Sequence, residues 1–545
     1  MILSLLLATA SFDWFSYAGA DPVDRAVRPT AAEYRNPILQ GFYPDPSITR
    51  VGADYYLVNS TFAWFPGIPI WHSRDLTTWR QIGNAIDRPG QLDFAKLGLS
   101  RGVFAPAIEH HAGVFYILNT CVDCGGNFLV TARNPAGPWS DPVWLPDLEG
   151  AIDPSLFVDA DGSAWIVNNG PPQGKPRYEG HRAIWIQRFD TKTLKTFGPR
   201  TMLIDGGVDP ASKPIWIEGP HLIARNGWYY LICAEGGTAI NHSQVVLRSR
   251  RPDGPFTPGP NPILTQRDLP ATRNFPVTSA GHADFVTTPD GRWWASFLAV
   301  RPYTGDLYNT GRETFLLPVD WSGEWPRILP PQTAIPLAVR RPTLPRDTRP
   351  AAPTSGAIAW REEFDRPALG PAWMMMRNPR DAWYDLRARP GALTLTARGV
   401  MLGDNGNPSF LARRQQHMNA TVTTRVRLDT GRGQAGLAAL QNDDYWFAIA
   451  LAGRGDGRVV RLLRRGGSTD PAAGTLVAEA ALSGAATAPV ELRAVAAGAS
   501  YRFSYATKPG RWQALGAAQD GTLLSTARAG GFVGAVFGPF ATEVR

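Results

Sequence analysis

The chain of 545 residues has only three cysteines, no concentrated basic segment and no long apolar run beyond its first residues. Three cysteines cannot form a disulfide framework, and Cys121 and Cys124 lack the second pair or the histidines of a zinc site, so their role stays open. The net charge of +8 comes from scattered cations without interleaved aromatic residues, which excludes a nucleic-acid groove. No later run reaches about 18 apolar residues, so no membrane span is expected.

The N-terminus carries the one apolar stretch that needs its own explanation. The stretch from Ile2 to Ala10 is followed by Ala18, Gly19 and Ala20, which resemble an A-x-A cleavage site. The pattern predicts a signal peptide over residues 1–20, and therefore a secreted or periplasmic protein. The alternative is an ordinary chain start with an apolar tail, because no Lys or Arg precedes the stretch.

Glycine and proline, in contrast, are abundant. The 55 glycines and 48 prolines indicate many turns and short strands, which favours an all-β protein over one with long helices. Because a single hydrophobic core stops growing near about 250 to 300 residues, the chain length predicts at least two domains.

Five related segments recur in the first part of the chain. Each one reads as a β-hairpin: a small or polar start, an apolar strand, a turn with glycine and an aromatic-rich strand. The five segments begin at Asp45, Ala105, Asp153, Gly219 and His282. Their spacing leaves room for a second hairpin in every unit, so residues 33–336 are predicted to form a five-bladed β-propeller.

The composition changes after the repeats. From Pro330 to Gly356 the chain carries seven prolines and no periodic apolar pattern, which predicts a stiff linker over residues 337–356. Residues 357–545 then alternate apolar and polar positions between glycine-rich turns, as the strands of an antiparallel sandwich do. We expect a jelly roll here.

The start of each innermost propeller strand lies beside the central channel, so equivalent residues of the five repeats should meet in one pocket. The residues at these positions are Asp45, Phe104, Asp153, Glu218 and His282. Proline follows both aspartates and is predicted to hold their backbone in an extended conformation. Two carboxylates in one pocket can divide the work of acid and base in the cleavage of a glycosidic bond.

Several motifs resemble glycoside hydrolase family 43. They are NPILQGFYPDPS, AIDPSLFVDADG, IEGPHL, GHADF and GRETFLLPVDW in the repeats, with EEFDRPALGPAW and LARRQQHMNATV farther on. The resemblance covers nearly the whole chain. It implies a catalytic five-bladed propeller followed by the concanavalin-like sandwich of the β-xylosidase members.

By the same resemblance, Asp45 is the general base of an inverting mechanism, Glu218 is the general acid, and Asp153 orients and tunes that acid. Inversion needs a water molecule between the base and the sugar, so the Asp45 and Glu218 carboxyl groups should lie about 6.5 to 9.5 Å apart. The resemblance implies no cofactor for the chemistry.

Four further residues are candidate substrate contacts. Arg312 in GRET is expected to reach the sugar, the alternative being a buried ion pair with Glu313 or another acid. His282 is expected to face a hydrated ion in the channel, often calcium, and alternatively is a core histidine. Phe62 and Phe104 are expected as pocket walls, with core packing as the alternative. Many relatives carry Trp at the position of Phe104.

The resulting hypothesis is an exo-acting enzyme that releases β-D-xylose from xylo-oligosaccharides or xylan. The close alternative is an α-L-arabinofuranosidase that acts on arabinoxylan or arabinan side chains. A noncatalytic glycan-binding protein is the remote alternative, since such a protein would usually have lost the acid or the base. The sandwich is expected to support the propeller and to lend a loop to the pocket rim. Oligomeric state and endo- against exo-action stay open.

Overall fold

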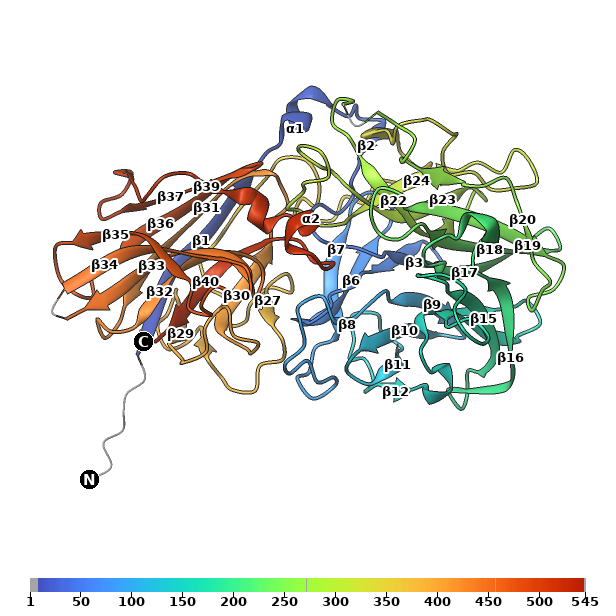
Figure 1. The fold of residues 1–545 in the computed structure, drawn as a ribbon, viewed down its shortest axis with the longest axis horizontal. Helices are drawn as coiled ribbons and strands as arrows, with labels where there is room; N and C mark the ends of the chain where they lie inside the picture. The colour runs from blue at the N-terminus through green and yellow to red at the C-terminus, as the bar shows by residue number, and fades with distance from the viewer. Residues whose placement is uncertain (1–7, 271, 456, 544–545) are drawn as a thin grey trace.

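The computed structural model describes residues 8–270, 272–455 and 457–543, which form two domains built almost entirely of strands (Figure 1). The five helical segments are short: α1 (Pro22–Ala26), α2 (Thr526–Ala529) and the 3-10 turns Pro146–Leu148, Pro210–Ser212 and Gly521–Leu524. Within the described ranges, no helix has the length and apolar character that crossing a membrane requires.

The first domain is the predicted five-bladed propeller. Its inner strands β3, β9, β13, β17 and β22 each contact the next, and β22 contacts β3, so the ring of blades is closed. Blade one contains β3 (Ser47–Val51), β4 (Asp54–Val58), β6 (Gly67–Ser73) and β7 (Arg80–Ile86). Blade two contains β8 (Gly102–Val103), β9 (Ala107–His111), β10 (Val114–Val122), β11 (Gly126–Ala132) and β12 (Val143–Trp144). Blade three contains β13 (Ile152–Val158), β14 (Ala164–Gly170), β15 (Ala183–Asp190) and β16 (Lys195–Asp205).

Blade four contains β17 (Glu218–Arg225), β18 (Trp228–Glu235), β19 (Ser243–Ser249), β20 (Thr257–Pro258) and β21 (Leu264–Thr265). Blade five has only three strands of its own: β22 (Thr278–Thr287), β23 (Trp293–Val300) and β24 (Glu313–Val319). The segment before the first repeat completes it, because Leu39 forms a bridge with Thr314, and the Asn36 side chain hydrogen-bonds both the N–H and the C=O of Leu316. The last blade is thus joined to the start of the propeller chain.

Two large antiparallel sheets form the second domain. One sheet contains β28 (Tyr384–Asp385), β29 (Leu393–Thr396), β1 (Thr9–Gly19), β31 (Asn419–Leu428), β36 (Val490–Ala497), β37 (Ser500–Ala506) and β38 (Gln513–Ala514), with β26 (Ile358–Glu362) on β1 and β39 (Gln519–Asp520) on β37. The other contains β35 (Thr475–Leu482), β34 (Gly457–Gly466), β33 (Tyr445–Arg454), β32 (Gln434–Asn442), β40 (Val536–Thr542), β30 (Ser409–Arg414), β27 (Met374–Met376) and β5 (Trp64–Phe65). Apolar residues at alternate positions of both sheets share one core.

The position of β1 corrects the prediction for the N-terminus. This strand lies inside the sandwich, where it pairs with β31 on one side and with β26 and β29 on the other. It is the blue strand among the orange and red ones in Figure 1. Phe12, Phe15 and Tyr17 are buried in the core. Cleavage after Ala20 would remove a central strand, so a leader that ends there is contradicted. Residues 1–7 of the predicted signal peptide lie outside the described residues.

The predicted linker is attached to the propeller along much of its length. Strand β25 (Ala338–Arg340) pairs with β2 (Glu33–Arg35), so the first four linker residues belong to the propeller side. Farther along, Asp347 forms an ion pair with Arg80. The proline-rich composition therefore marks a segment that follows the propeller surface.

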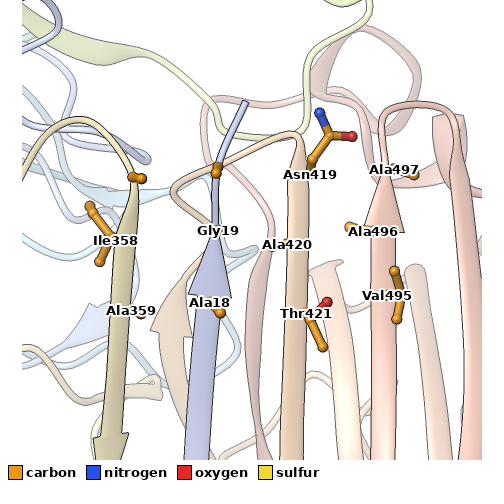
Figure 2. Close-up of a pocket in the computed structure, with 12 residues that line it drawn as sticks. Ala18, Gly19, Ile358, Ala359, Asn419, Ala420, Thr421, Val495, Ala496 and Ala497 are labelled. Atoms are coloured by element: carbon orange, nitrogen blue, oxygen red, sulfur yellow. The ribbon is translucent and has the colours of Figure 1, made fainter. Parts of the chain in front are cut away.

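The sandwich sheet that contains β1 has a hollow of its own. One end of the β26–β1–β31–β36 surface has a shallow hollow of about 460 Å³, shown in Figure 2. Its lining is mostly small and includes Ala18, Ala359, Thr421 and Val495, without a titratable side chain. A hollow of this composition cannot supply acid or base, so the chemistry has to be sought in the propeller.

Candidate active site

A pocket of about 450 Å³ lies where the inner propeller strands begin. Every side chain predicted for the site lines it: Asp45, Phe62, Phe104, Asp153, Glu218, His282 and Arg312. The remaining lining residues are Arg101, Ala105, Val122, Ile152, Ile215, Trp216, Gly237, Thr238 and Phe532. Residues far apart in the sequence thus meet at one place, as the alignment of the repeats requires.

The backbone at this pocket differs from the prediction. Asp45 and Asp153 have φ values of 51° and 53°, so they are left-handed and not extended. His282 and Phe62, at 56° and 53°, share this conformation. The residue after each aspartate is a proline, which disfavours the right-handed helical region but does not select the extended one. A left-handed conformation in a residue with a Cβ costs about 1–2 kcal/mol, and the surrounding strands have to hold it.

β-Bulges account for the altered course of the chain in three blades. The pairing register shifts between Ile152 and Ser155 in β13, between Glu218 and His221 in β17, and between Gly281 and Asp284 in β22. A bulge bends a strand and turns a side chain away from the regular alternation. Asp153 and His282 lie within two of these irregular stretches, and Glu218 lies at the edge of the third.

Asp45 is fixed by two donors. The guanidinium of Arg312 donates to both carboxylate oxygens, from Nη1 at 2.9 Å and from Nη2 at 3.3 Å. The Ser60 hydroxyl donates to Oδ2 at 2.5 Å. A forked pair of this kind sets the plane of the carboxylate as well as its position.

Arg312 therefore forms an ion pair, but with Asp45 and not with its neighbour Glu313. Glu313 pairs instead with Arg301 at 2.6 Å, away from the pocket. Since Arg312 also lines the pocket, it can keep Asp45 in place and still donate to a ligand. The ion pair that the sequence left open is therefore formed, with Asp45 as the acid, and the contact of Arg312 with the sugar stays a prediction.

Glu218 has a different environment. Its side chain is buried, and burial together with the negative charges of Asp153 and Asp45 outweighs the opposing charges of His282 and Arg312 and raises the pKa of its carboxyl group to about 8. At neutral pH the group is therefore mainly protonated. A protonated carboxyl group in a pocket can act as a general acid.

Asp153 connects the acid to His282. Its Oδ2 accepts a hydrogen bond from the backbone N–H of Gly219 at 3.1 Å and lies 3.5 Å from Nε2 of His282. Burial alone would lower the pKa of His282, but the hydrogen bond to Asp153 and the charges of Asp45, Asp153 and Glu218 raise it to about 9. Asp153 thereby anchors the residue that follows Glu218.

Gly219 is required at its position. It has a φ of 54°, and a Cβ there would lie 2.7 Å from the His282 ring. Any larger residue would displace the imidazole or the strand that carries Glu218. The glycine of the IEGPHL motif therefore allows the acid and His282 to pack closely.

The predicted ion beside His282 finds little support in these side chains. The described parts of the chain contain no group of three or more His, Cys, Asp or Glu side chains placed to hold a metal. The set of residues does not fit a directly bound calcium ion, and a water-mediated one stays a prediction.

Three phenylalanines form one wall of the pocket. The ring centroids of Phe62 and Phe104 lie 5.5 Å apart, and Phe532 lies 5.9 Å from Phe62 and 5.7 Å from Phe104. The Arg312 guanidinium lies 5.5 Å from the Phe532 ring. Phe62 and Phe104 are thus pocket walls and also pack against one another. The sequence repeats could not point to Phe532, because it belongs to the sandwich.

The sandwich holds this wall in place. Strand β5, which begins two residues after Phe62, pairs with β27, so the sandwich sheet continues close to the residue that forms the pocket wall. On the other side, the Phe532 N–H donates to the Ser100 hydroxyl at 2.9 Å. Gly311 and Gly534 allow the two backbones to approach, since a Cβ on Gly311 would lie 2.9 Å from the Cα of Gly534. The second domain is therefore part of the pocket, as predicted.

A disulfide settles the role of the two neighbouring cysteines. Cys121 and Cys124 are joined at the turn between β10 and β11. Between them, Val122 lines the pocket and Asp123 forms an ion pair with Arg101, which also lines it. The disulfide thus closes a turn at the pocket rim.

Comparisons with known proteins agree with this architecture. Residues 34–326 match the model of glycosyl hydrolases family 43, and residues 361–544 match that of the beta xylosidase C-terminal concanavalin A-like domain. A xylosidase/arabinosidase of Butyrivibrio fibrisolvens is 38% identical, over 77% of this chain and 80% of its own length. A non-reducing end alpha-L-arabinofuranosidase of Bacteroides ovatus is 36% identical, over 79% and 78%.

A solved structure extends the similarity to the whole chain. The crystal structure of a GH43_12 protein from a capybara gut metagenome is 38% identical, with a TM-score of 0.91, over 98% of this chain and all of that one. Sequence motifs, the closed ring of five blades, the paired carboxylates and the second domain all lead to one assignment: the chain belongs to glycosyl hydrolase family 43.

Proposed function

We propose that the protein is an inverting exo-glycosidase that removes a terminal pentose, β-D-xylose, from xylo-oligosaccharides or xylan. The observation that carries the proposal is the contrast between two carboxyl groups in one pocket. Asp45 is clamped by Arg312 and Ser60, whereas Glu218 is buried with a raised pKa. The names of the relatives, xylosidase/arabinosidase among them, support a pentoside as the substrate.

The proposed reaction uses both groups at once. Asp45 takes a proton from a water molecule, whose oxygen attacks the anomeric carbon from the face opposite to the leaving group. The bond to the leaving oxygen breaks, and Glu218 gives that oxygen its proton. Asp153 is a positioning residue in this scheme, because it holds the Gly219 N–H next to the acid. The products are a free pentose with inverted configuration and a shortened chain.

The shape of the pocket supports action at a chain end. The wall of Phe62, Phe104 and Phe532 closes one side with rigid apolar rings, and such faces pack well against the C–H face of a sugar. Arg312 adds a planar set of donors for ring hydroxyls.

An α-L-arabinofuranosidase is the second candidate, supported by the relative from Bacteroides ovatus. Initial rates on nitrophenyl β-D-xyloside and nitrophenyl α-L-arabinofuranoside, followed by sugar-resolved product release from xylo-oligosaccharides and arabinoxylan, separate the two. A higher kcat/KM on the xyloside, with xylose as the main product, is expected. Preferential release of arabinose would favour the second candidate, and turnover of neither pentoside would contradict both.

Export from the cytoplasm is also part of the proposal. It is supported by the Cys121–Cys124 disulfide, since structural disulfides persist in oxidising compartments, and by substrates that are polymers. Fractionation of the native host is the test: we expect the protein outside the cytoplasm, and retention inside would contradict it.

A further inference from the structure

The pocket has a second apolar wall, on the side of the acid. Ile215 and Trp216 line the pocket and are 50% and 37% exposed, although large apolar side chains are mostly buried in this chain. They come directly before Ile217 and Glu218 in the sequence. An exposed apolar surface inside a sugar pocket indicates a contact for a ligand.

The Trp216 ring is held in one position. The backbone of Trp216 is left-handed, with a φ of 48°, and its backbone N–H donates to the Gly180 carbonyl at 2.9 Å. The guanidinium of Arg182 lies over the indole, 4.9 Å from its centroid. Arg182 is fixed in turn, because it donates to Oδ1 of Asn169 at 2.6 and 2.9 Å and to the Gly150 carbonyl at 2.7 Å.

The chain on either side of Trp216 is also anchored. The Ile215 carbonyl accepts hydrogen bonds from the N–H groups of Gly236 and Gly237 at 2.9 and 3.1 Å. The Ile217 carbonyl accepts one from the Asn169 side chain at 2.6 Å. Asn169 thus supports both Arg182 and the residue next to Glu218, so the wall and the acid are held by the same group.

The positions of Asp45 and Glu218 indicate which part of the substrate this wall contacts. The reacting pentose has to lie where Asp45 can deliver water, beside Arg312 and the phenylalanine wall. The leaving group has to lie beyond the oxygen that Glu218 protonates. We propose that Trp216, backed by Arg182 and flanked by Ile215, is the platform that binds the leaving sugar. The inference rests on the proposed function and extends it to the other half of the substrate.

The platform selects a class of leaving group. An indole face binds a ring that presents several C–H bonds on one side, which the chair of an all-equatorial pyranose such as xylose does. The next xylose unit of a chain satisfies this requirement, and a leaving group without a ring does not. The contact should act on kcat/KM for disaccharides and leave hydrolysis of substrates with a small leaving group unchanged.

The test compares xylobiose with β-D-xylosyl fluoride, whose leaving group is a single atom. Trp216→Ala is expected to lower kcat/KM on xylobiose about tenfold and to change kcat/KM on the fluoride less than about twofold. Trp216→Phe is expected to recover much of the loss on xylobiose. Phe197→Ala is the matched control, since Phe197 is also exposed and also lies against an arginine, Arg188, but outside the pocket. Phe197→Ala should leave kcat/KM unchanged on both substrates.

Two results would overturn the platform. An equal loss on both substrates would mean that Trp216 shapes the site of the reacting sugar, and an unchanged kcat/KM on xylobiose would mean that the leaving sugar does not contact it. A wild-type protein that hydrolyses neither substrate contradicts the proposed function itself, so the two failures are distinguishable.

Discussion

At the scale of residues, the site shows how one chemical group obtains two roles. Asp45 and Glu218 are both carboxylic acids that line the same pocket. Asp45 accepts hydrogen bonds from an arginine and a serine, whereas burial and the charge of a neighbouring aspartate raise the pKa of Glu218. This difference in surroundings supports the proposed division of work, with Asp45 as the base and Glu218 as the acid.

Replacement of Asp45 by alanine is expected to abolish turnover without unfolding the protein. Loss of the base should lower kcat on a nitrophenyl pentoside by about 1000-fold or more, because no other group activates the water. Asp161→Ala, at an exposed hairpin turn, is the control for a removed carboxylate. Circular dichroism checks the fold. Retention of more than about a tenth of wild-type activity would refute the assignment of the base.

The rate should fall on the alkaline side as Glu218 loses its proton. The pKa of about 8 is raised by burial and by Asp153, so the acid is active below this value and inactive above it. The measurement is kcat/KM on xylobiose from pH 5 to 10, and the expected profile declines above about pH 8. A profile that stays level to pH 10 would show that the proton comes from another group.

The sequence was enough to find the residues that the repeats align. Asp45, Asp153, Glu218 and His282 occupy equivalent strand starts, so symmetry alone brings them together. It could not find Phe532, whose contacts depend on how two domains pack. It also gave the wrong backbone at Asp45 and Asp153, because a following proline excludes one conformation without choosing between the others.

At the scale of elements, the junction of the two domains builds the pocket. Strand β5 extends the sandwich sheet up to Phe62, and the segment before β40 brings Phe532 against the same ring. The pairing of β5 could not be predicted from periodicity, since β5 has only two residues.

Removal of the Phe532 ring is expected to weaken binding of the pentose. Phe532→Ala should raise KM about fivefold to tenfold, because one member of the three-ring wall is lost. Leu476→Ala, an exposed apolar residue of the sandwich, should leave KM unchanged. Steady-state kinetics gives KM for both variants, and a thermal unfolding curve of each checks that it is folded. An unchanged KM in the Phe532 variant would mean that the sandwich only supports the propeller.

At the scale of the whole molecule, the first and the last strand of the described residues lie in the same domain. Strand β1 lies in the sandwich, the following segment closes the fifth blade, and β40 returns to the sandwich. Arg301 reinforces the connection, because it pairs with Asp21 near β1 and with Glu313 in the propeller. The two domains are thus tied by strands and by charges.

The architecture was predictable where the pattern was regular. Repeats and a proline-rich segment separated the two domains, but the strand character of residues 9–19 was hidden. A bulge between Phe12 and Trp14 breaks the alternation of apolar and polar residues that marks a half-buried strand. The strand over residues 9–19 therefore lacks the periodic pattern by which a sequence indicates a strand.

In the proposed reaction, Asp45 and Glu218 act from opposite sides of one sugar. This arrangement is tested most directly by proton NMR of the anomers released early from xylo-oligosaccharides, before mutarotation. We expect α-xylose as the first product, since inversion of a β-linkage places the new hydroxyl on the other face. Early accumulation of β-xylose would mean retention, and would contradict the assignment of the two carboxyl groups.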